Sequence, residues 1–67
     1  MAELPLAPMK RIVKLSGAGR VSEEAAEALR DVIEDAALEI ARRAVQLARH
    51  AGRKTVTKGD IKLAARE

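Results

Sequence analysis

The stretch RHAGRKTVTKGD, residues 49–60, gathers side chains that suit the binding of phosphate groups. It holds four lysine or arginine residues, one histidine and two threonines within twelve positions. Lysine and arginine neutralise phosphates and release their counterions, and threonine hydroxyls and loop N–H groups hydrogen-bond phosphate oxygens. Arg53, Lys54 and Thr55 are therefore candidate phosphate contacts. A solvated basic loop between two helices is the alternative interpretation, because most such runs of charge are of that kind.

The positive charge of the 67-residue chain lies toward its two ends. Residues 1–22 carry a net charge of +3, residues 23–51 a net charge of −3, and residues 52–67 a net charge of +3. This distribution indicates an anionic partner. The chain has no aromatic residue, so the stacking of unpaired bases on aromatic rings, which single-strand binders use, is excluded.

Residues for enzymatic, cofactor or metal chemistry are scarce. The chain has no cysteine and one histidine, and it lacks both a nucleophile–base arrangement and a glycine-rich phosphate loop of the Walker type. We therefore expect no enzyme activity, no cofactor, no small-molecule substrate and no metal site. No apolar run is long enough to cross a membrane, and the N-terminal MAELPLAPM lacks the features of a signal peptide, so a cytoplasmic location is expected.

Three helices separated by two breaks are predicted. The first covers about Leu6–Ser16. The second covers Ser22–Ala51, with Ser22 as its N-cap, and the third begins at Thr57. Gly52 suits the left-handed position that follows a helix end. Thr57 and Asp60 have the spacing of a capping box, although aspartate is shorter than the usual glutamate. The fold class is therefore all-α.

The central helix is too long and too widely apolar for one chain to cover. It spans roughly 44 Å at about 1.5 Å per residue, whereas a compact domain of this size has a radius of gyration of about 11 Å. Its apolar positions occur on more than one face, so they require cover on several sides. We therefore expect an obligate dimer with crossed central helices, whose core is formed by Leu29, Val32, Ile33, Ala36, Ile40 and Ala44.

An acidic stripe recurs every four residues on the central helix and consists of Glu27, Asp31, Asp35 and Glu39. Like charges at this spacing repel one another mildly. A solvated helix face is the simplest interpretation. Divalent-metal binding, and contact with basic residues of a neighbouring dimer, are the two alternatives.

The order of short, long and short helix with basic loops resembles the histone fold. Four segments are similar to archaeal histones: ELPLAP at residues 3–8, GAGRVS at 17–22, LARHAGRKTV at 47–56 and DIKLA at 60–64. The resemblance covers essentially the whole chain and implies one histone-fold domain over residues 1–67, without tails. It further implies a head-to-tail dimer of this chain, or of this chain with a paralogous histone. Such dimers would bind, bend and wrap double-stranded DNA in the nucleoid and assemble into larger particles.

The resemblance also implies roles for individual residues. Arg20, in the first break, would reach the minor groove, as nucleosome arginines do. Arg53 would pair with Asp60 and brace the second loop, and Leu47, His50 and Asp60 would form the contact between dimers. The implied DNA-binding set is Arg11, Lys14, Arg20, Arg53, Lys54, Thr55 and Lys58.

The sequence departs from archaeal histones at several positions. Gly19 stands where the family often has glutamate, Gly59 stands where a better helix former is usual, and Lys10 also differs. A histone-fold dimerisation module that does not bind DNA is the alternative function, but such modules can lack the basic loops that this chain retains. A sequence-specific repressor is a more distant third possibility, because the short third helix offers few base-reading side chains.

Overall fold

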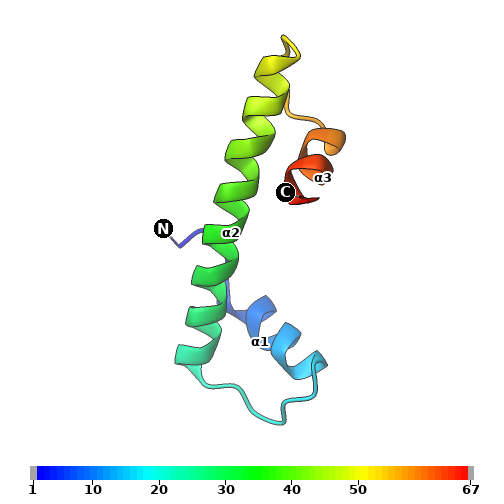
Figure 1. The fold of residues 1–67 in the computed structure, drawn as a ribbon. Coiled ribbons are helices and arrows are strands. Elements are labelled where there is room, and N and C mark those ends of the chain that lie inside the picture. Colours follow the sequence, from blue (N-terminus) through cyan, green and yellow to red (C-terminus); the bar gives the residue numbers. More distant parts are fainter. Residues whose placement is uncertain (1, 67) are drawn as a thin grey trace. The chain divides into compact units, whose positions relative to one another are not determined.

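Three helices make up the regular structure of the chain (Figure 1). The computed structural model describes residues 2–66, in which α1 covers Leu6–Leu15, α2 covers Glu23–His50 and α3 covers Lys58–Arg66. No strand occurs in that range, so the predicted all-α order of short, long and short helix is confirmed, with boundaries within one residue of those expected. None of these helices is long and apolar enough to cross a membrane.

Two prolines and a glycine set the limits of α1. Pro5 is the N-cap, with an extended backbone at φ −73° and ψ 158°, and no side chain caps the helix start. Pro8 lies in the first turn, where a backbone N–H has no partner within the helix. After the cap residue Ser16, Gly17 adopts a φ of 114°, a conformation that glycine tolerates and other residues avoid. The chain therefore leaves the helix at this point.

Caps at both ends define α2. The Ser22 Oγ accepts a hydrogen bond of 3.0 Å from the backbone N–H of the third helical residue, which is the expected N-cap contact. At the other end the Arg53 N–H donates to the Ala48 carbonyl at 2.8 Å, and the Gly52 N–H donates to the Arg49 carbonyl at 2.9 Å. These two bonds form a Schellman motif, and Gly52 has the predicted left-handed φ of 74°.

Two compact units divide α2 between them, the first ending at Asp35 and the second beginning at Ala36. In the first unit α1 lies beside the N-terminal half of α2 (Figure 1). Met9 of α1 and Ala26 of α2 are buried there. Within the described part of this unit, Met9 is the only large apolar side chain that is buried, so the unit has a small core.

In the second unit α3 packs against the C-terminal half of α2 through alanine side chains. Ala44 and Ala64 are fully buried, and Ala48 is 2% exposed. The Arg43 Nε donates a hydrogen bond of 3.3 Å to the Ala64 carbonyl. Small side chains let the two helices approach closely, but they remove little apolar area from water.

Large apolar side chains remain exposed in both units. Leu15 is 81% exposed, Val32 is 64% exposed and Leu63 is 48% exposed. The six residues of the predicted dimer core differ in burial. Two are exposed, Val32 and Ala36, and three are half-buried, Leu29, Ile33 and Ile40. Ala44 alone is buried within the chain. One chain therefore leaves much of this apolar set accessible.

Candidate nucleic-acid interface

An arginine–aspartate pair holds the loop between α2 and α3. The Arg53 Nη1 donates to the Asp60 Oδ2 at 2.8 Å, and its Nη2 donates to the Asp60 Oδ1 at 2.8 Å. The same Nη1 donates to the Thr55 carbonyl at 3.0 Å. A guanidinium fork matches the geometry of a carboxylate, and such bidentate bonds are among the stronger ones in proteins. The structure thus brings together the two residues that the resemblance pairs.

Asp60 also caps the start of α3. Its Oδ2 accepts hydrogen bonds from the Thr57 backbone N–H at 2.8 Å and from the Thr57 hydroxyl at 3.0 Å. In return the Asp60 N–H donates to the Thr57 Oγ1 at 3.4 Å. This is the predicted capping box. The short aspartate side chain serves both partners because Oδ2 is shared between Arg53 and Thr57.

These contacts lower the pKa of the Asp60 carboxyl well below its usual range. The side-chain hydrogen bond from Arg53 is the largest cause, followed by the backbone hydrogen bond from Thr57, whereas burial opposes the shift. The same side-chain bond raises the pKa of Arg53 above its usual value. Both groups are therefore charged at neutral pH, and the Asp60 side chain is only 8% exposed.

Exposed cations lie in this braced loop and at the start of α3. Lys54 and Lys58 are exposed, and the Arg53 side chain keeps 40% of its surface accessible. The uncharged Thr55 between them is exposed as well. Beside them lies a shallow cavity of about 220 Å³, lined by Val45, Ala48, Arg49, Arg53, Lys54 and Val56. The loop therefore presents several positive charges on a backbone that its own side chains hold in place.

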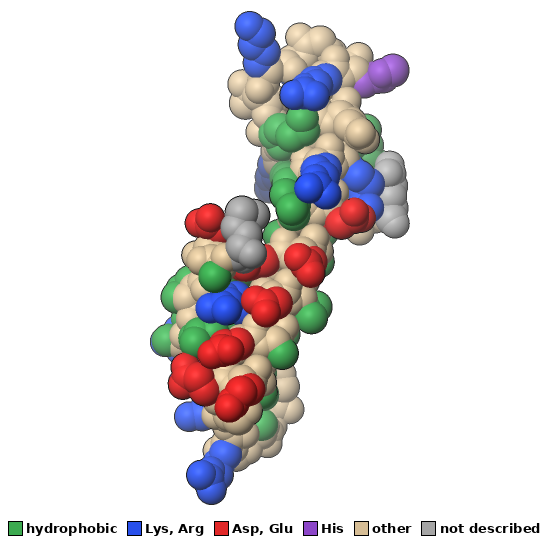
Figure 2. All heavy atoms as spheres, turned by 90° about the vertical axis from the view of Figure 1, so that its left-hand side faces the viewer, with side chains coloured by type: hydrophobic (Ala, Val, Ile, Leu, Met, Phe, Trp, Pro, Cys, Tyr) green, Lys and Arg blue, Asp and Glu red, His purple; other side chains and the backbone are tan. Residues whose placement is uncertain are grey.

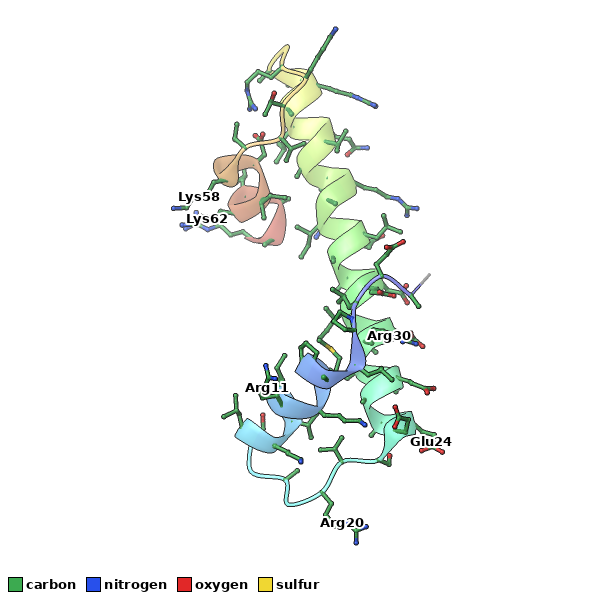
Figure 3. All side chains as sticks on the ribbon, turned by 180° about the vertical axis from the view of Figure 1, so that it is seen from behind. Arg11, Arg20, Glu24, Arg30, Lys58 and Lys62 are labelled. Carbon is green, nitrogen blue, oxygen red and sulfur yellow. The ribbon has the colours of Figure 1, made fainter. Side chains whose placement is uncertain are left out.

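The first unit carries the other cations of the predicted set. Arg11 and Lys14 on α1 and Arg20 in the first loop are all exposed, and Figure 3 shows Arg20 extending away from that loop. Within residues 2–66 none of these three has an acidic partner within 4 Å. Lys10 differs, because its Nζ lies 3.1 Å from a carboxylate oxygen of Glu23. Of the cations on α1, Lys10 is therefore the one neutralised within the described part of the chain.

The three residues implied in the contact between dimers have different surroundings. Leu47 is half-buried, and His50 is exposed in the last turn of α2. Asp60 is buried and bonded to Arg53 and Thr57. Its carboxylate already has several hydrogen bonds within its own chain.

Comparison with known proteins decides the family. The model of the family described as histone-like transcription factor (CBF/NF-Y) and archaeal histone matches residues 2–65. The chain belongs to this histone family. It is 52% identical over 66 residues to one of the subunits of archaeal histone HAN1 from Thermococcus zilligii. It is 56% identical over 66 residues to probable archaeal histone 3 of Methanocaldococcus jannaschii, and each alignment covers 98% of both chains.

This membership confirms the predicted histone fold and gives the chain a histone-fold role in DNA packaging. Packaging is a structural activity, so the prediction that the chain is no enzyme is confirmed by the family to which it belongs.

The acidic stripe of this histone is largely a solvated surface. Figure 2 shows several acidic side chains gathered on one face of the first unit, and all four members of the stripe are exposed. Local cations offset two of them, since Arg30 lies 3.4 Å from Asp31 and Arg43 lies 3.4 Å from Glu39. Within the described residues no group of three potential ligands is placed to hold a metal ion, so the metal interpretation gains no support.

Sequence reasoning overlooked Glu34, an acidic residue of the histone's α2 that lies outside the stripe. Its Oε2 accepts hydrogen bonds from the backbone N–H groups of Glu3 and Leu4. The only signal in the sequence is negative: Glu34 is not part of the four-residue repeat of its acidic neighbours, although it lies seven residues after Glu27 and so close to the same face of the helix.

Proposed function

We propose that this histone is a chromatin architectural protein that binds, bends and wraps double-stranded DNA largely without sequence specificity. It acts as dimers that can assemble into larger histone–DNA particles. The observation that carries the proposal is the set of exposed cations at both loops of a chain from a DNA-packaging family, with Arg20 at the first loop and Lys54 and Lys58 at the second.

The second loop is suited to phosphate because its backbone is ordered before DNA arrives. A surface that is already ordered loses less entropy on binding. Arg53 has five N–H donors, and its bonds to Thr55 and Asp60 use three of them. The two remaining donors, with the Lys54 ammonium and the Thr55 hydroxyl, contact phosphate oxygens in this proposal.

The first unit adds contacts of a second kind. Arg11 and Lys14 contact the DNA backbone from α1, and Arg20 enters the minor groove. None of these contacts reads the base pattern of the major groove, which is the source of most direct sequence recognition. Binding preferences therefore follow the ease with which a DNA sequence bends. Such a protein belongs with the chromosome in the nucleoid.

The protein partner in this proposal is a second histone chain. The exposed Val32 and the half-buried Leu29 and Ile33 of α2 are apolar surface that a head-to-tail dimer would cover. A second copy of this chain is the simplest partner. One relative is named as one of the subunits of an archaeal histone, which supports a paralogous histone as the other candidate. Contacts between dimers would use Leu47, His50 and Asp60.

The proposal is tested by digesting long duplex DNA with micrococcal nuclease at increasing protein ratios. A ladder of regularly spaced protected fragments is expected, because dimers added one after another wrap successive lengths of DNA. A single protected size would indicate a closed particle instead. If the folded dimer protects no DNA at low salt, the chain is a dimerisation module that does not bind DNA.

A residue-level test compares Lys54→Ala with Arg42→Ala. Both substitutions remove one exposed cation of the second unit, but Arg42 lies outside the proposed DNA-binding set. Lys54→Ala is expected to reduce the steepness of the plot of log affinity against log salt by about 0.9, the value for one lost phosphate contact. Arg42→Ala is expected to leave that slope unchanged. Equal effects of the two substitutions would contradict the assignment of Lys54.

A further inference from the structure

Glu34 ties the N-terminal segment of the chain to α2. The backbone N–H groups of Glu3 and Leu4 both donate to the Glu34 Oε2, the second at a distance of 2.6 Å. Hydrogen bonds to an ionised carboxylate are roughly twice as strong as neutral ones. The other oxygen, Oε1, is buried and has no hydrogen-bond partner among the described residues. Two successive backbone donors therefore depend on a single carboxylate oxygen.

The tied segment leads directly into α1. Pro5 follows Leu4, has no N–H to donate, and is the N-cap of a helix without a side-chain cap. Beyond this tie, the described part of α1 has one fully buried side chain, Met9, several half-buried ones, and one ion pair to α2, between Lys10 and Glu23. That ion pair is exposed at both ends, and exposed pairs stabilise a fold only weakly. The Glu34 contact is therefore a main determinant of how firmly the start of α1 is held against α2.

We propose that Glu34 is a positioning residue for DNA binding, which fixes the start of α1 and so holds Arg11 and Lys14 in place for phosphate contacts. The inference rests on the proposed function, because it takes these two cations to be DNA contacts. Arg11 and Lys14 are exposed, and α1 carries them two and three turns after the tied segment. A helix whose start moves freely presents its cations over many orientations, and each phosphate contact then costs additional entropy.

The inference makes a prediction opposite in sign to simple electrostatics. Replacing Glu34 by alanine makes the protein one charge more positive, which by itself strengthens attraction to DNA. The proposed positioning role predicts weaker binding. Asp35 provides a matched control, because it is the adjacent acid on the same helix, is exposed, and makes no side-chain hydrogen bond within the described residues. Asp35→Ala therefore changes the charge equally without releasing the N-terminal segment.

The experiment compares the wild-type chain of 67 residues, Glu34→Ala and Asp35→Ala as folded dimers. Amide hydrogen exchange at Leu4 is expected to become about tenfold faster in Glu34→Ala, because a charge-assisted hydrogen bond is lost. DNA affinity is expected to fall about tenfold relative to Asp35→Ala, with a salt slope less steep by about 1 to 2, as for one or two lost phosphate contacts. Glu34→Gln keeps an acceptor oxygen at this position. Its exchange rate at Leu4 and its DNA affinity are therefore expected to lie between those of Glu34→Ala and wild type.

A double-mutant cycle separates positioning from general destabilisation. The cycle compares losses of DNA-binding free energy. If Glu34 acts through α1, Glu34→Ala causes little further loss in a chain that already carries Arg11→Ala and Lys14→Ala. In a chain that carries Lys54→Ala, in the second unit, Glu34→Ala causes its full loss. Full additivity with both sets would overturn the inference. Should Glu34→Ala fail to fold, the pair Glu34→Gln and Asp35→Asn repeats the comparison with the same charge change at both positions.

The outcomes distinguish this inference from the function on which it rests. Wild type that binds DNA, with Glu34→Ala binding as tightly as Asp35→Ala, overturns the positioning role alone. Unchanged exchange at Leu4 overturns it as well. A folded wild-type dimer that binds no DNA at low salt overturns the proposed function, and the positioning role with it.

Discussion

At the scale of single residues, one carboxylate joins the loop and the helix that carry the proposed DNA contacts. The Asp60 Oδ2 accepts from Arg53 and from both donors of Thr57. Losing the negative charge would therefore loosen the α2–α3 loop and the start of α3 together. Because the charges are held within the chain, this pair stabilises the loop whether or not DNA is present.

The pH dependence of folding tests the role of Asp60. Its pKa is lowered in the folded chain, so its contribution to stability is present above the unfolded-state pKa of about 4 and is lost as pH falls toward the folded-state value. Asp60→Asn is expected to lower the free energy of unfolding at neutral pH, and the difference from wild type is expected to shrink as pH falls below about 4. Denaturant unfolding at a series of pH values measures this.

Asp35→Asn is the control for that series, since Asp35 is exposed and forms no side-chain hydrogen bond within residues 2–66. Its free energy of unfolding should follow that of wild type across the same range. A difference between Asp60→Asn and wild type that stays constant with pH would contradict the assigned role of the Asp60 charge.

Bracing and phosphate contact are expected to separate when Arg53→Lys is compared with Lys54→Ala. Arg53→Lys keeps the charge but loses the bidentate fork, so it should lower the free energy of unfolding and leave most of the salt dependence of DNA binding intact. Lys54→Ala removes an exposed charge, so it should change the free energy of unfolding by at most about 0.5 kcal/mol. Equal losses of stability in the two variants would contradict this division of roles.

The residue-scale contacts differ in how far the sequence predicts them. The capping box of Thr57 and Asp60 has a recognisable spacing. The pairing of Arg53 with Asp60 came from the family resemblance, because two opposite charges seven residues apart in a loop have many possible geometries. The contact of Glu34 has no positive signal in the sequence. Its donors are the backbone N–H groups of residues 30 and 31 positions away, and any residue type except proline supplies such a donor.

At the scale of elements, local chemistry determines the helix ends, which is why they were predictable to within one residue. Ser22 and Gly52 mark the two ends of α2 through hydrogen bonds with residues close to them in the sequence. The packing of α3 was less predictable. The apolar stripe predicts that Ala44 belongs to the dimer core, and the structure shows that Ala44 is fully buried within the chain. A periodic pattern gives the apolar face of a helix but not the element that covers it.

Two glycine substitutions test the role of Gly52 at the C-terminal end of α2, with Gly19 of the first loop as the comparison. Gly52 has a φ of 74°, and a Cβ added there would meet no atom within 4 Å, so Gly52→Ala is expected to cost about 1 kcal/mol from backbone strain alone. Gly19 has equally open surroundings without a positive φ. Gly19→Ala is therefore expected to be neutral, or stabilising by up to about 1 kcal/mol. Denaturant unfolding at neutral pH compares them, and equal effects would contradict the strain at Gly52.

At the scale of the whole molecule, the length of α2 and its widely spread apolar positions predicted that one chain cannot cover it. The structure is consistent with that physical reasoning, because the buried core of the described residues consists of Met9 and four alanines. The sequence does not indicate which exposed apolar residues contact a second chain, since α1, α2 and α3 all carry exposed side chains of the same apolar types. Which of them meets a second chain depends on the geometry of association.

The proposed dimer makes a prediction about two exposed apolar residues. Val32 is 64% exposed and Leu15 is 81% exposed, but only Val32 belongs to the proposed dimer core. Val32→Asp would place an unpaired carboxylate in that core in each of two copies, and it is expected to raise the dimer dissociation constant at least about a hundredfold. Leu15→Asp introduces the same charge on α1 and is expected to leave dissociation within about threefold of wild type.

Sedimentation over a range of protein concentrations measures both dissociation constants. Melting should support the result, because a fold stabilised by association melts at a temperature that rises with protein concentration. Wild type and Leu15→Asp are expected to show that rise, and Val32→Asp is expected to melt at a lower temperature at every concentration. A folded wild-type monomer at micromolar concentration, or a dimer that tolerates Val32→Asp, would mean that α2 is covered in some way other than by pairing through this apolar stripe.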